Sequence, residues 1–87
     1  MSIEFADKLV EYVVDELINI KISQDLNKID QNRLKTFFEF IVTKIQQLNN
    51  LGPRKNTLQE AQLIVLITAR DDILHDIKLK RILGITD

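Results

Sequence analysis

The sequence predicts an all-α fold, a small antiparallel bundle of three main helices with room for a short extra helical turn. Apolar residues recur at spacings of three and four over three long stretches, which is the period of a helix with one buried face. Only two Gly and one Pro occur in 87 residues, so breaks between elements are few. A chain of this length closes one core, and we expect residues 1–87 to form a single domain.

The first helix is predicted over residues 3–20. Ser2 is placed to cap its start. Its apolar stripe includes four residues spaced four apart, Phe5, Leu9, Val13 and Leu17. Farther along, the isoleucines at positions 18, 20 and 22 alternate with polar residues, as they would in a strand. Because no second convincing strand is present to pair with it, this segment is interpreted as the fraying end of the helix.

The second helix is predicted over residues 31–51, after a polar connection with a short helical turn around Leu26 and Ile29. Asp30 is a suitable N-cap. The helix ends at Gly52, which tolerates a positive φ, and Pro53, which cannot continue a helix. The apolar residues that should face the core are Leu34, Phe37, Phe38, Ile41, Ile45 and Leu48.

The third helix is predicted over residues 58–83, between a capping box formed by Thr57 with Glu60 and a terminal Gly84. Within it, residues 63–67 are apolar on every side of a helix, which is typical of a helix enclosed all round. A buried strand is the alternative. The β-branched content of this run favours a strand, but the capping box and the 26-residue length oppose it.

This apolar third helix predicts self-association. Two neighbouring helices leave one of its sides open, and a symmetric homodimer is the commonest way to cover such a side. The residues expected at the partner interface share one broad side of the helix: Leu63, Leu66, Ile67, Leu74 and Ile77. The alternative is that a short first helix and the turn near Ile29 close the monomer.

A metal-binding bundle is the weakest functional alternative, and it rests on the segment from Asp71 to Asp76. Asp72 and His75 are three residues apart and would share a helix face, as acid and histidine ligands do in metal-binding bundles. Such a site needs two of these pairs, but the chain has one histidine, so a dimer would have to supply the second. We therefore expect no metal and no cofactor.

Nucleic-acid binding is the main alternative function. It would use two basic groups, one in the turn after the second helix and one at the end of the third: Arg54 and Lys55, then Lys78, Lys80 and Arg81. Two observations weigh against it. Cations in a last helical turn are expected because of the helix dipole, and the net charge of the chain is −1.

The remaining composition excludes several classes of function. There is no cysteine, which excludes disulfides and thiol chemistry, and a single histidine with two serines gives no catalytic triad signature. Clustered acids near Asp15 lack matched partners for a magnesium-dependent hydrolase. No apolar run approaches the roughly 20 residues that span a bilayer. We therefore expect a cytoplasmic, non-enzymatic protein-interaction module, an adaptor, regulator or assembly factor that acts as a homodimer with a still unidentified protein partner.

Overall fold

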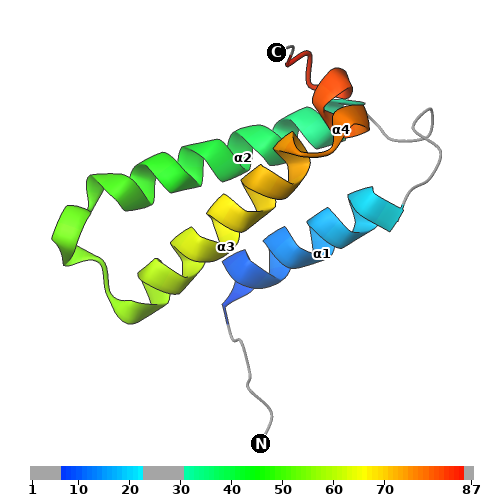
Figure 1. The fold of residues 1–87 in the computed structure, drawn as a ribbon. Helices are drawn as coiled ribbons and strands as arrows, with labels where there is room; N and C mark the ends of the chain where they lie inside the picture. Colours follow the sequence, from blue (N-terminus) through cyan, green and yellow to red (C-terminus); the bar gives the residue numbers. More distant parts are fainter. Residues whose placement is uncertain (1–6, 23–30, 86–87) are drawn as a thin grey trace, which may run out of the picture.

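The computed structural model describes residues 7–22 and 31–85, and it confirms the all-α fold (Figure 1). The main helices are α1 (Lys8–Ile22), α2 (Gln31–Asn50) and α3 (Thr57–Leu74). A 3-10 turn, η1 (Gly52–Arg54), and a short helix, α4 (Ile77–Ile82), complete the described part, in which no strand occurs. None of these helices is both long enough and apolar enough to cross a membrane.

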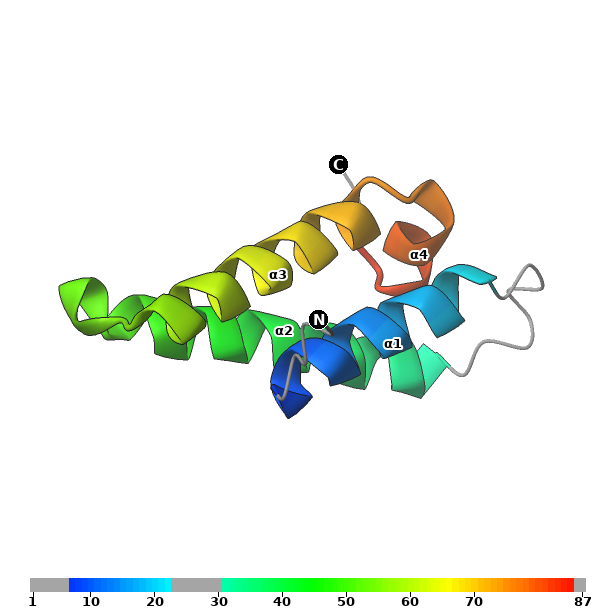
Figure 2. The same cartoon turned by 90° about the horizontal axis from the view of Figure 1, so that it is seen from below.

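The three main helices form an up-down-up bundle. Figure 1 shows α1 and α3 running in the same direction and α2 running against both. α3 packs against both α1 and α2, and in Figure 2 it forms a layer over the other two. The smallest dimension of the molecule, 19 Å, matches two layers of helices about 10 Å across.

The core lies where the three helices meet, and α2 supplies its largest share. Five of the six core residues predicted on α2 are buried, and the sixth, Phe38, packs against them half-buried. Phe37 is fully buried, and the ring of Tyr12 on α1 meets it edge-on with 5.8 Å between the centroids. Tyr12 meets Phe40 in the same way at 5.2 Å. These aromatic contacts fasten α1 to α2.

The predicted third helix over residues 58–83 is wrong at its C-terminal end, because the helix α3 ends at Leu74 and His75 is its C-cap. Asp76 has extended backbone angles, φ −93° and ψ 109°, and its carboxylate accepts hydrogen bonds from the amides of Lys78 and Leu79 at 3.0 and 3.2 Å. Aspartate competes with helical hydrogen bonds in this way and favours a cap over a helix interior. The short helix α4 that follows turns back over the bundle and buries Leu79.

The start of α3 differs from the prediction by one residue. Asn56, and not Thr57, is the N-cap: its side chain accepts from the amide of Gln59 at 2.8 Å, and the Gln59 side chain accepts from the amide of Asn56 at 3.0 Å. The sequence allows both registers, and asparagine is at least as good an N-cap as threonine. The stops at Gly52 and Gly84 are confirmed, because both have a positive φ, 56° and 74°.

The first helix is shorter at its start than predicted. Asp7 is not helical, and its carboxylate accepts from the amide of Leu9 at 3.3 Å, as an N-cap does, and from the Gln62 side chain at 2.8 Å. At the other end α1 continues to Ile22, which confirms the helical interpretation of the alternating isoleucines. The proposed caps Ser2 and Asp30 and the turn at residues 26–29 lie outside the described residues.

Candidate interaction surface

The predicted partner interface on α3 lies mostly inside the protomer. Leu66 has no exposed surface within the protomer, and its place at a partner interface stays a prediction. Leu63 and Ile67 are half-buried against the core, and Leu74 is half-buried too. These residues are buried within the protomer because α3 packs between α1 and α2 and because α4 folds back at its C-terminal end. Its apolar surface is used mainly within one chain.

Three positions of the predicted third helix depart from the expectation that it is fully enclosed. Leu58, at its start, is 52% exposed, Ile64, within the apolar run, is 66% exposed, and Ile77 is 71% exposed. Ile77 is thus the only one of the five predicted interface residues that is largely accessible, and it belongs to α4 and not to α3.

A row of exposed aliphatic residues lies on α1, where the sequence did not predict an interface. Val14, Ile18 and Ile22 are spaced four apart and are 41%, 48% and 69% exposed. They share one helix face, away from the buried Val13 and Ile20. A signal was present in the sequence: at 100° per residue, the apolar positions from Leu9 to Ile22 cover about 220° of the helix, about twice what a core-facing stripe needs.

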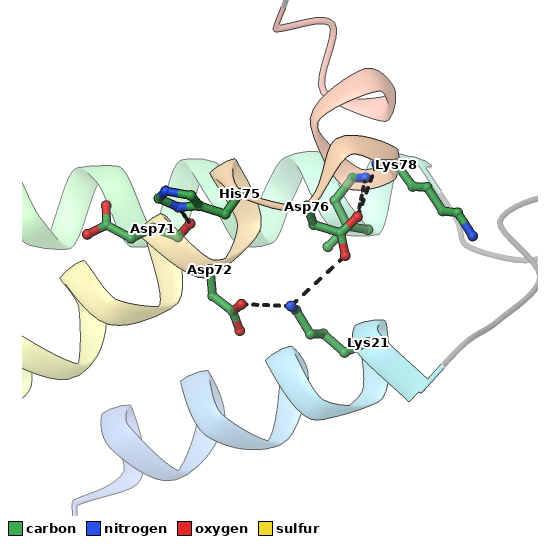
Figure 3. Close-up of polar contacts among 7 residues, drawn as sticks. Lys21, Asp71, Asp72, His75, Asp76 and Lys78 are labelled. Atoms are coloured by element: carbon green, nitrogen blue, oxygen red, sulfur yellow. Dashed lines mark hydrogen bonds and ion pairs between the residues drawn. The ribbon is translucent and has the colours of Figure 1, made fainter.

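Ile77 lies across an open hollow from Lys21, near the C-terminal end of α1. Lys21 of α1 donates a hydrogen bond to Asp72 of α3 at 2.7 Å, and its Nζ lies 4.0 Å from the Asp76 carboxylate (Figure 3). Lys21 and Ile77 also line the same open hollow of about 430 Å³. Ile22 follows Lys21 directly and is the last residue of α1, so the exposed row of α1 ends at the end of the helix that approaches Asp72 and Asp76. We call Val14, Ile18, Ile22 and Ile77 the apolar line.

The structure separates the side chains of the predicted metal pair. Figure 3 shows Asp72 directed toward Lys21, whereas the His75 ring lies over the last turn of α3. There its Nδ1 is 2.6 Å from the backbone oxygen of Asp71. His75 is the C-cap of α3, so the helical geometry assumed for the pair ends at this residue. Within residues 7–22 and 31–85, no three His, Cys, Asp or Glu residues are grouped closely enough to hold a metal ion.

The basic residues of the nucleic-acid alternative lie at opposite ends of the bundle. Arg54 is in η1, before α3, and the three residues of the other group are in α4, after it (Figure 1). The 18 residues of α3 separate them by about 27 Å at 1.5 Å per residue. Lys55 is engaged locally and donates to the carbonyl of Gly52 at 2.7 Å. These five residues therefore do not form one basic surface within a protomer, and nucleic-acid binding stays an untested prediction.

The acidic residues of α1 divide into a paired and an exposed set. Glu16 forms an ion pair with Arg33 of α2 that helps hold the two helices together. Glu11 and Asp15 are exposed, and no ion pair within the described residues involves either of them. The exposed face of α1 thus combines aliphatic side chains with charges of both signs, because the exposed Lys8 lines the same hollow as Glu11 and Asp15.

Comparison of the chain with protein-family models, with curated proteins and with solved structures finds no match. The exposed surface of the bundle is therefore what bears on its function.

Proposed function

We propose that this chain is a small protein-interaction module, an adaptor, regulator or assembly factor, that acts as a homodimer through the apolar line. The observation that carries the proposal is the exposure of these four aliphatic side chains, between 41% and 71%, beside a core that closes without them. The absence of cysteine supports a reducing compartment, and we place the protein in the cytoplasm on that ground.

The arrangement of the apolar line supports contact with another helix. Single exposed aliphatic residues are common on monomers, but a row spaced four apart forms a ridge that fits the groove of a second helix. Full burial of one such side chain is worth about 1.5–3 kcal/mol. Covering the exposed parts of four side chains therefore contributes on the order of a few kcal/mol, which offsets part of the entropy lost on association.

Sedimentation equilibrium of the wild type and of Ile18→Asp tests this function. We expect the wild type to have a dimer mass at micromolar concentration, and Ile18→Asp to shift the mass toward the monomer because it places a charge in the middle of the contact. Ile18 is 48% exposed, so the variant should keep the helical circular dichroism of the wild type.

Ile64→Asp is the matched control, because Ile64 is equally aliphatic and 66% exposed but lies on α3 outside the apolar line. This variant should keep the dimer mass. A wild-type chain that remains monomeric throughout the micromolar range would contradict the proposed function.

A further inference from the structure

A second open hollow lies beside the start of α1, at the end of the bundle away from α4. Its volume is about 370 Å³. Three leucines line it: Leu9 of α1, Leu48 of α2, and Leu51, which follows α2. Leu48 is buried and the other two are half-buried, so all three belong to the core or pack against it. The rest of the lining is polar and consists of Lys44, Gln47, Gln59 and Gln62.

The hollow is open because α1 covers only part of the pair formed by α2 and α3. Figures 1 and 2 both show the end of α2 and the start of α3 extending beyond the start of α1. The helix begins at Lys8, so Leu9 is the first of its residues that pack against the core. Toward the open end of the pair, no helix within residues 7–22 and 31–85 continues this cover.

The chain enters α1 at the edge of this hollow. The carboxylate of Asp7 accepts a hydrogen bond of 2.8 Å from the side chain of Gln62, which lines the hollow. An extended chain advances at most about 3.6 Å per residue, so the Cα of Phe5 is held within about 7 Å of the Cα of Asp7. A side chain tethered at this range has an effective concentration in roughly the millimolar range, far above that of a free partner.

Phe5 is the fourth member of the apolar stripe predicted for the first helix. The other three members, Leu9, Val13 and Leu17, belong to the core or pack against it. A phenylalanine ring carries a large apolar surface, so its removal from water is strongly favourable. The leucines of the hollow offer an apolar surface within the range that Asp7 sets. Chemistry and tether therefore indicate the same occupant.

We propose that this hollow is the docking site of Phe5 from the same chain, with the ring packed on Leu9, Leu48 and Leu51. Docking of this side chain extends the apolar stripe past the start of α1 and closes the open end of the core. The inference is independent of the homodimer, because the hollow and the apolar line have no residue in common.

A single tryptophan tests the docking. The sequence contains no tryptophan, so Phe5→Trp introduces the only one. Its emission should lie at shorter wavelength than that of the matched control Ile64→Trp, because Ile64 is 66% exposed and an indole there stays in water. Acrylamide should quench the tryptophan at position 5 several-fold less than the one at position 64. This protection should not change with protein concentration, because the occupant belongs to the same chain.

A double-mutant cycle identifies the hollow as the place of docking. Urea denaturation at low protein concentration should show that Phe5→Ala raises the equilibrium constant of unfolding on the order of tenfold. In a Leu51→Ala background the same substitution should raise it by only about threefold, because the two side chains contact each other. Ile77→Ala is the matched control at the other end of the bundle, and in its background the effect should stay about tenfold.

Three results would overturn the proposal. The first is a tryptophan at position 5 that acrylamide quenches as freely as the one at position 64. The second is an effect of Phe5→Ala that Leu51→Ala leaves unchanged. The third is protection that appears only as the protein concentration rises, since the occupant would then come from another chain.

Discussion

At the scale of single residues, the carboxylate of Asp76 decides where α3 ends. It accepts hydrogen bonds from two backbone amides at the start of α4. It also lies 4.0 Å from the Nζ of Lys21 on α1. One side chain therefore caps α4 at the point where α1, α3 and α4 approach one another. The cap turns the chain back and buries Leu79, which connects a local hydrogen bond to core packing.

Replacing Asp76 with alanine should lower the free energy of unfolding by about 1 kcal/mol, because two amides lose their acceptor. Asp76→Asn is the control, since asparagine keeps the capping oxygen and removes the charge, and it should retain most of the stability. Urea denaturation followed by circular dichroism measures both. Equal losses in the two variants would mean that the charge, and not the cap, is what stabilises this turn.

The N-cap of α3 gives a second test at this scale. Asn56→Ala removes the acceptor for the Gln59 amide and should cost about 1 kcal/mol, whereas Thr57→Ala should change the free energy of unfolding by only a few tenths. Denaturant titrations of the two variants compare the two registers directly. A larger loss for Thr57→Ala would restore the register expected from the sequence.

Among the helices, α3 shows that the side of the helix on which an apolar residue lies determines how exposed its side chain is. Leu66 is fully buried and Ile64, two residues earlier, is 66% exposed. Helical geometry explains the difference, because residues two apart are separated by about 160° around the helix axis and so point to nearly opposite sides. An apolar run on a helix with neighbours at its sides therefore still leaves an outer edge in contact with solvent.

Alanine substitutions on α3 should reproduce this pattern. Leu66→Ala should lower the free energy of unfolding by about 2–5 kcal/mol, because it removes buried methyl groups and leaves a cavity. Ile64→Ala should change it by less than about 0.5 kcal/mol in the monomer, as expected at an exposed position. Thermal and urea denaturation at low protein concentration measure both changes, and similar losses at the two sites would contradict the burial of Leu66 and the exposure of Ile64.

At the scale of the whole molecule, the sequence predicts the bundle but not its outer surface. Periodic spacing identifies the buried residues of α2, from Leu34 to Leu48, because one helix face must meet the core. The interruption of the third helix at Asp76 could not be predicted in this way, because an acidic residue in a polar segment is as common on a solvated helix face as at an N-cap. The apolar line could not be predicted from periodic spacing either. The spacing gives the width of an apolar stripe, but it does not show which helices cover that stripe.

The contact of Tyr12 with Phe37 and Phe40 has a spectroscopic consequence. The sequence has one tyrosine and no tryptophan, so the tyrosine emission and much of the near-ultraviolet circular dichroism arise from this one position. The ring sits where α1 meets α2, half-exposed and beside two phenylalanines. The protein therefore contains a natural optical probe of whether its first helix is docked, and separation of α1 from α2 can be followed without any added label.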